Sequence, residues 1–189
     1  MNMREIALSL TAVRSRGEAA AVPMDEEGFR VLYEETARPL LAYLVRASGS
    51  PEAASDLFQE AFFHLLRARN LPPETAGRRK YLFRIATNLL RDQWRRGKRD
   101  GLTRRETSVE ERGDGDAELG CSVRSALRQL QPRERQMLWL AYVEEYDHRE
   151  IAAIMGLRYG SVRILLFRAR HKLAGLLRAR DAIGMEKGT

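Results

Sequence analysis

Apolar residues recur at spacings of three and four positions through two long blocks of the chain, and this periodicity constrains the fold more than any other feature. The first block covers residues 26–99 and the second covers residues 120–180. Such spacing places apolar side chains on one face of an α-helix, whereas strands alternate with a period of two. No segment has a clear strand pattern. The sequence therefore predicts an all-α protein made of two small helical domains.

Capping and turn residues divide the first block into three expected helices. The first ends near Gly49, because glycine is favoured just after the last helical turn. Ser50 then supplies an N-cap and Pro51 a first helical position, so a second helix runs from there to about Arg69. A third helix is expected over about residues 77–96. The expected apolar stripes are Phe29, Leu32, Tyr33, Leu40, Leu41 and Leu44, then Leu57, Phe58, Ala61, Phe62, Leu65 and Leu66, and finally Leu82, Ile85, Ala86, Leu89 and Leu90.

Three segments lie outside the periodic blocks. Residues 1–25 show no sustained periodicity and are expected to form a disordered N-terminal extension. Residues 100–119 are acidic and contain Gly113 and Gly115, a composition typical of a flexible linker. Residues 181–189 are expected to form a tail. The predicted organisation is thus two domains joined by an acidic linker.

Composition limits the partners and the compartment. Lys and Arg number 33 against 26 Asp and Glu, and the formal net charge of +7 favours a polyanionic partner. Cys121 is the only cysteine, which excludes a disulfide framework within the chain and fits a cytoplasmic location. The apolar run at residues 6–13 is short and makes a poor secretory signal. No stretch reaches the roughly 18–20 apolar residues that membrane insertion requires.

The segment from Asp147 to Leu157 has the pattern of a helix-turn-helix. Asp147 and Glu150, three residues later, match a capping box with Asp in the usual Ser/Thr position. Gly156 can provide the left-handed turn between two helices. The following helix, expected to begin at Gly160, carries many basic residues and no acidic one over its expected length. Such a helix suits the major groove of DNA.

Motifs in both blocks match one known family. The motif Asp56-Leu-Phe-Gln-Glu-Ala-Phe62 and the segment from Tyr81 to Asp92 stand in the first block, and the segment from Leu130 to Arg170 stands in the second. In this order they resemble regions 2.2, 2.3–2.4 and 4 of the extracytoplasmic-function (ECF) sigma factors, a group of the sigma-70 family. The resemblance implies a non-enzymatic subunit, without a cofactor, that directs RNA polymerase to promoters.

The resemblance also implies a division of labour, with residues 26–99 as region 2 and residues 120–180 as region 4. Region 2 would bind core polymerase through Asp56, Leu57, Gln59, Glu60 and Phe62. It would bind the −10 element through Arg79, Lys80, Tyr81, Arg84, Asn88, Arg91 and Arg95. Region 4 would bind the −35 element through His148, Arg149, Gly160, Ser161, Arg163, Ile164, Phe167 and Arg168. The implied partners are the β′ clamp helices and β flap of core RNA polymerase, promoter DNA and an anti-sigma factor, with no small-molecule substrate and no membrane insertion.

The chemistry of these residues suits the implied roles. Asp56 and Glu60 share a helix face, where acids can pair with basic residues of a partner helix. The basic residues over 78–99 can follow phosphates, and Tyr81 and Trp94 offer flat rings for unstacked bases. An exposed acidic face and two core aromatics would account for the same pattern without any partner. Periodicity alone leaves both interpretations open.

The sequence departs from its relatives at a few positions. Tyr81 stands where the family usually has Trp, and the tyrosine ring keeps a face on which a base can stack. Ile164 and Leu165 stand where a Ser-Arg pair is common, and Arg158 replaces the usual capping Ser or Pro. A polar contact and a charge are therefore missing, which puts the ordinary −35 contacts in doubt.

The sequence is compatible with two other functions. The first is a two-domain helix-turn-helix regulator that binds promoters without joining polymerase, because helix-turn-helix domains occur in many regulators. The second is a helical metalloenzyme, suggested by Asp56, Glu60 and His64 at successive four-residue steps. The other histidines, His148 and His171, lie in the other domain, so no metal-binding or catalytic residue is expected.

Overall fold

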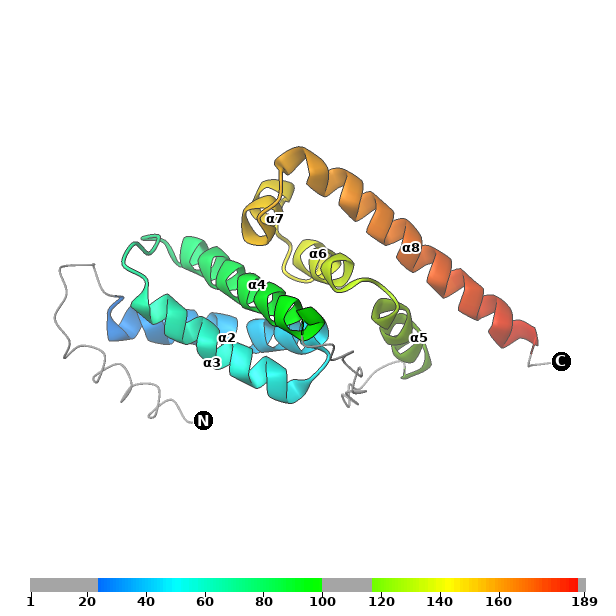
Figure 1. Ribbon diagram of the computed structural model, residues 1–189, viewed down its shortest axis with the longest axis horizontal. Helices are drawn as coiled ribbons and strands as arrows, with labels where there is room; N and C mark the ends of the chain where they lie inside the picture. The colour runs from blue at the N-terminus through cyan, green and yellow to red at the C-terminus, as the bar shows by residue number, and fades with distance from the viewer. Residues whose placement is uncertain (1–23, 100–116, 187–189) are drawn as a thin grey trace.

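The computed structural model describes residues 24–99 and 117–186, and every regular element within these ranges is an α-helix (Figure 1). The helices are α2 (Glu26–Ser48), α3 (Pro51–Arg67), α4 (Thr75–Arg99), α5 (Ala117–Arg128), α6 (Pro132–Tyr142), α7 (His148–Met155) and α8 (Tyr159–Glu186). The all-α prediction is confirmed. The predictions for residues 1–23, 100–116 and 187–189 lie outside the described residues.

Local capping fixes the start and end of the first helices. The Asp25 side chain accepts a hydrogen bond from the Gly28 backbone N–H at 2.9 Å at the start of α2. Gly49 ends that helix with φ of 72°, in the left-handed region that glycine adopts without strain. The Ser50 hydroxyl then accepts from the Ala53 N–H at 3.2 Å and starts α3. The expected boundary between these two helices is confirmed.

Several helix ends differ from those expected. Helix α3 ends at Arg67 rather than near Arg69, and α4 is longer at both ends than the expected range 77–96. Helix α5 begins at Ala117, inside the expected linker. Helix α8 continues to Glu186, well into the expected tail, because the segment contains no proline and is rich in strong helix formers.

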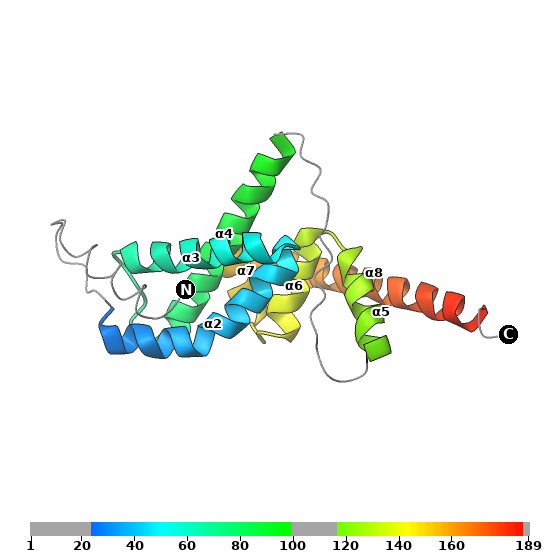
Figure 2. The same cartoon turned by 90° about the horizontal axis from the view of Figure 1, so that it is seen from below.

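Helices α2, α3 and α4 form one bundle (Figure 2). Leu32 and Leu40 of α2, Leu65 of α3 and Leu82 of α4 are fully buried between them. An aromatic cluster joins α2 to α3 at one end, with the Tyr33 and Phe62 ring centroids 5.3 Å apart. Most residues of the expected apolar stripes are therefore buried, but Leu41 is 40% exposed. Five others are partly buried against the core: Tyr33, Phe58, Leu66, Ile85 and Leu89.

Helices α5 to α8 form a second group, in which α8 packs against α5, α6 and α7. Ile151 and Met155 of α7 are buried, as are Val162 and Leu166 of α8. An ion pair between Lys172 Nζ and Glu134 Oε2, at 2.8 Å, joins α8 to α6 at the surface.

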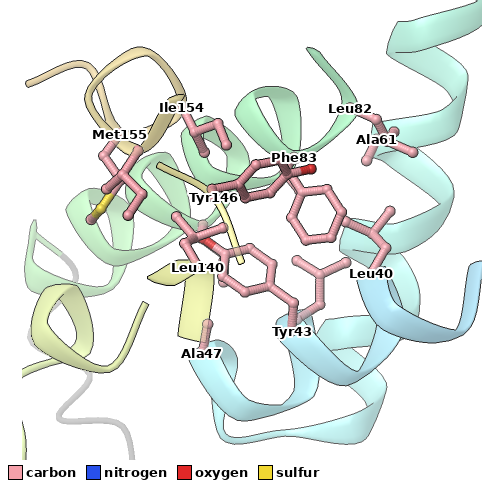
Figure 3. Packing of buried hydrophobic residues seen from close by; sticks show 14 of the residues in the cluster. Leu40, Tyr43, Ala47, Ala61, Leu82, Phe83, Leu140, Tyr146, Ile154 and Met155 are labelled. Atoms are coloured by element: carbon pink, nitrogen blue, oxygen red, sulfur yellow. The ribbon is translucent and has the colours of Figure 1, made fainter. Parts of the chain in front are cut away.

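The two groups of helices pack against each other and share one continuous apolar core. Helix α4 lies against α7, and α2 lies against α6 (Figure 1). Tyr43, Phe83, Leu140 and Tyr146 meet at this junction (Figure 3). The Phe83 ring lies 5.4 Å from the Tyr43 ring and 5.7 Å from the Tyr146 ring, measured between centroids. Tyr43 and Phe83 were absent from the expected stripes because the side they occupy is buried by the other domain.

Candidate nucleic-acid interface

Helix α3 presents an acidic face to solvent. Asp56, Gln59 and Glu60 are exposed, and Phe63 on the same side of the helix is 45% exposed. The guanidinium of Arg67 lies 5.2 Å from the centre of the Phe63 ring. Acidic side chains around an exposed aromatic ring make a surface that suits a basic partner helix.

Two residues expected on this surface lie in the core instead. Leu57 is 4% exposed and Phe62 is 3% exposed, and both pack inside the α2–α4 bundle. They follow the apolar side of α3, which faces α2 and α4, so they are not available to a partner in this structure. Phe63 was missed by the sequence analysis, although its position three residues after Glu60 places it on the acidic face.

Helix α4 carries the residues expected at the −10 element, and the structure divides them into two sets. Arg84, Asn88 and Arg95 are exposed. Tyr81 is half-buried beside them, with the Arg84 guanidinium 5.9 Å from the centre of its ring. Trp94 is also half-buried, so neither aromatic ring is a fully buried core residue.

The second set contacts the other domain. Arg79 Nη2 lies 2.7 Å from Glu144 Oε2, and Lys80 Nζ lies 3.1 Å from Glu150 Oε1. Arg91 Nη2 donates a hydrogen bond to a backbone carbonyl in α7 at 2.7 Å. In this structure these three basic residues are therefore engaged within the chain.

Helix α7 begins with the capping box that the sequence predicts. One Asp147 carboxylate oxygen accepts hydrogen bonds from the N–H groups of Arg149 and Glu150, at 2.7 and 2.8 Å. Glu150 returns a bond by accepting from the Asp147 N–H at 2.9 Å. The hydrogen bond from the Glu150 N–H is the largest effect on the pKa of Asp147, and together with the Arg149 N–H and the charges of Arg149 and Lys80 it outweighs desolvation and lowers that pKa below its usual value. The carboxylate thus stays charged at the positive end of the helix dipole.

The turn after α7 also has the expected form. Gly156 has φ of 61°, and the Leu157 N–H donates to the Ala152 carbonyl at 2.8 Å. Helix α7, this turn and α8 together form the helix-turn-helix of the C-terminal domain. Helix α8 begins at Tyr159, one residue before the expected start at Gly160.

One face of α8 is open to solvent and mixes basic and apolar side chains. Arg163 and Arg168 are exposed, while Ile164 and Phe167 are 54% and 51% exposed. The Phe167 ring packs against the His171 ring at a tilt of 40°, with centroids 4.0 Å apart. Exposure of adjacent isoleucine and phenylalanine side chains to water is unfavourable in free energy, so this face suits burial by a partner.

The remaining expected −35 residues lie at the start of the two helices. His148, Arg149 and Gly160 are exposed, and Ser161 is half-buried. The Arg149 guanidinium lies 5.6 Å from the centre of the Tyr159 ring. Tyr159 is itself 57% exposed and was missed by the sequence analysis, because it precedes the expected helix start.

A groove outside the expected sites lies between α5, α6 and α8 at the end of α2. Its volume is about 680 Å³. Trp139, Tyr142, Val143, Leu173 and Leu177 supply apolar lining. Tyr142 and Val143 are 56% and 55% exposed.

The described residues provide no support for the metal alternative. Within residues 24–99 and 117–186, no three His, Cys, Asp or Glu side chains are grouped so that they could hold a metal ion. Glu60 and His64 lie 3.7 Å apart as a surface pair on α3. No helix in the same ranges is long and apolar enough to cross a membrane.

Comparison with known families matches both halves of the chain. Residues 32–100 match the model of sigma-70 region 2, and residues 121–173 match that of sigma-70 region 4. The chain is 33% identical over 174 residues to the ECF RNA polymerase sigma factor SigE of Mycolicibacterium smegmatis. The chain belongs to the ECF group of the sigma-70 family. The family prediction is confirmed, and with it the helix-turn-helix as the DNA-binding element of region 4.

The relatives of this sigma factor differ in length. The match to SigE includes 85% of this chain but spans only 64% of SigE. The RNA polymerase sigma factor CarQ of Myxococcus xanthus is 29% identical over 157 residues, which cover 80% of this chain and 90% of CarQ.

Solved structures with the same fold contain sigma factors bound to other proteins. RpoE of Bartonella quintana, solved with the anti-sigma factor NepR, superposes with a TM-score of 0.65 at 23% identity and covers 79% of this chain and 96% of RpoE. CnrH, solved with the cytosolic domain of CnrY, has a TM-score of 0.55 at 27% identity, covering 90% of this chain and 96% of CnrH.

Proposed function

We propose that this sigma factor binds core RNA polymerase, recognises −10 and −35 promoter elements and initiates transcription at a specific set of promoters. The open face of α8 carries the proposal. It follows a capped helix and a glycine turn, it is basic through Arg163 and Arg168, and these two side chains are exposed among the residues that the structure describes. This is the geometry by which a recognition helix enters the major groove.

The exposed parts of region 2 supply the other contacts. Asp56, Gln59, Glu60 and Phe63 on α3 form the proposed site for the β′ clamp helices of core polymerase. Arg84, Asn88 and Arg95 on α4, with Tyr81 beside them, form the accessible part of the proposed −10 site. Basic residues position a strand through its phosphates, and an amide or a ring can read or stack on a base. The β flap and an anti-sigma factor, such as those in the complexes of the relatives, are further proposed partners.

The decisive experiment is transcription in vitro with core polymerase and a library of promoter fragments. Addition of this protein should start transcripts at fragments that share two short elements, while core polymerase alone should not. The alternative is a helix-turn-helix regulator that binds promoters without joining polymerase. It would be supported if the protein binds DNA fragments but neither joins core polymerase nor starts transcripts.

Within region 2, Asn88 and Arg84 are expected to behave differently. Asn88→Ala should reduce the difference in binding free energy between the preferred base and the other bases at one −10 position by about 1–3 kcal/mol. The reason is that an amide can form paired hydrogen bonds with a base edge. Arg84→Ala should weaken binding to all sequences and flatten the salt dependence, because a phosphate contact carries no sequence information. Binding of single-stranded −10 variants at several salt concentrations would measure both effects. Equal losses on every template would contradict the assignment.

Within region 4, Ile164 is expected to set a base preference. An exposed apolar side chain between Arg163 and Arg168 suits the methyl group of a thymine in the major groove. Ile164→Ser should shift the preferred base at one or two −35 positions with little loss of overall affinity. Selection of bound duplexes from a random library would measure this. An unchanged preference would mean that Ile164 meets a protein partner instead.

A further inference from the structure

Arg149 and Tyr159 form a pair of exposed side chains that links the two helices of the helix-turn-helix. Arg149 stands in the first turn of α7, and Tyr159 is the first residue of α8. The Arg149 guanidinium lies 5.6 Å from the centre of the Tyr159 ring, within the range in which a cation is attracted to a ring face. The starts of both helices are therefore joined at the surface by this one contact between side chains.

The contact with the ring holds Arg149 without neutralising it. In the part of the chain that the structure describes, no carboxylate forms an ion pair with this arginine. The capping box engages the Asp147 carboxylate, and Glu150 pairs with Lys80. A cation–ring contact uses the charge of the guanidinium and leaves its N–H groups able to donate to an anion. Arg149 thus keeps both its charge and its donors for another partner.

The fold gains little from this pair, because both side chains lie outside the core. Tyr159 is 57% exposed, and Arg149 is exposed as well. Substitutions at such positions usually change the stability of a protein little. The pair has a clearer benefit in binding. An arginine already held by a ring loses less rotamer freedom when it meets a partner than one that rotates freely.

The surface next to Tyr159 is open and positively charged. Among the described residues outside its own helix turn, no heavy atom lies within 4 Å of the position that a Cβ on Gly160 would occupy, and Gly160 does not have a positive φ. Neither packing nor a left-handed turn therefore requires glycine there, and glycine weakens a helix. What glycine does permit is the close approach of another molecule's backbone. Arg158 and Arg163 are exposed on either side of this position in the sequence, so a polyanionic backbone fits best.

We propose that Tyr159 is a positioning residue for −35 DNA, whose ring holds Arg149 so that the guanidinium contacts a phosphate at the edge of the element. This inference deepens the proposed function and rests on it, because it requires α7 and α8 to bind duplex DNA. In a helix-turn-helix the recognition helix enters the major groove, while the first helix crosses the DNA backbone. Arg149 at the start of α7 then meets phosphates, and Tyr159 supports it from the recognition helix.

The test is a double-mutant cycle in the full chain with Arg149→Ala, Tyr159→Leu and the double variant. The measured quantity is the dissociation constant of a fluorescent mixed-sequence DNA duplex at several salt concentrations, since a phosphate contact needs no particular sequence. Arg149→Ala should weaken binding about five-fold and reduce the salt slope by about one. Tyr159→Leu should weaken binding about two- to three-fold in the wild-type background and hardly at all when Arg149 is already alanine, because the ring acts through the arginine.

Two further variants separate the ring from other causes. Tyr159→Phe keeps the ring and loses the hydroxyl group, so it should bind the duplex as the wild-type chain does. The matched control Tyr142→Leu removes another tyrosine of the same domain, 56% exposed and outside the helix-turn-helix, and it should leave the affinity unchanged. Urea denaturation should give the same stability for Tyr159→Leu and the wild-type chain, because the replaced ring lies outside the core.

Three results would overturn the proposal. The first is wild-type affinity in Tyr159→Leu. The second is an equal loss from Tyr159→Leu with and without Arg149, which would mean that the ring contacts DNA itself or supports the fold. The third is a Tyr159→Phe variant as weak as Tyr159→Leu, which would assign the effect to the hydroxyl group. Failure of the proposed function has a different signature, since the wild-type chain would then bind the duplex without starting transcripts with core polymerase.

Discussion

Reversal of both acids on the exposed face of α3, Asp56→Lys with Glu60→Lys, is expected to weaken binding to core polymerase at least about ten-fold, which corresponds to about 1.4 kcal/mol. The two carboxylates lie one helical turn apart and face solvent. Lysines there would oppose a basic partner helix, and like charges across an interface are strongly unfavourable. Binding of fluorescently labelled protein to core polymerase would measure the loss.

The control for this prediction reverses two other exposed acids. Glu26 and Glu35 lie on α2, and their replacement by lysine produces the same change in net charge. That variant should bind core polymerase nearly as well as the wild-type protein. Since none of the four residues is buried, circular dichroism should show the same helix content in both variants. Equal affinity of the α3 variant and the wild-type chain would refute the assignment of this face.

Phe83→Ala is expected to lower the free energy of unfolding by about 3–5 kcal/mol. The ring is fully buried, and it packs against Tyr43 of its own domain and Tyr146 of the other. Its loss leaves a cavity in the core that both domains share. Urea denaturation followed by circular dichroism would measure the change.

Phe63→Ala is the matched control, because Phe63 is 45% exposed on α3. Its truncation should change the stability by no more than about 0.5 kcal/mol, as is usual for surface positions. If Phe83→Ala were equally mild, the two domains would not share a core in solution.

Much of the candidate site is encoded in short stretches of sequence. The capping box of Asp147 and Glu150, the left-handed turn at Gly156 and the basic face of α8 all depend on residues within a few positions of one another. Such features are set by local hydrogen bonds and by the helical repeat, so a pattern in the sequence predicts them directly. The family motifs are local in the same way.

Other features depend on which surfaces meet in space. Periodicity placed Leu57 and Phe62 in the apolar stripe of α3 and left the exposed Phe63 outside it. The family motif nevertheless assigned Leu57 and Phe62 to the polymerase surface, because a motif identifies a helix and not the neighbour that covers each side of it.

What the sequence by itself determined was the all-helical fold, the capped helix starts and the helix-turn-helix. Only the tertiary structure decided that the domains pack together and that Arg79 and Arg91 face region 4 instead of solvent. Their bonds to Glu144 and Met155 join residues 65 and 64 positions apart. Contacts over such separations leave no periodic trace in the sequence, since they depend on the summed burial of both surfaces and not on the preference of any short segment.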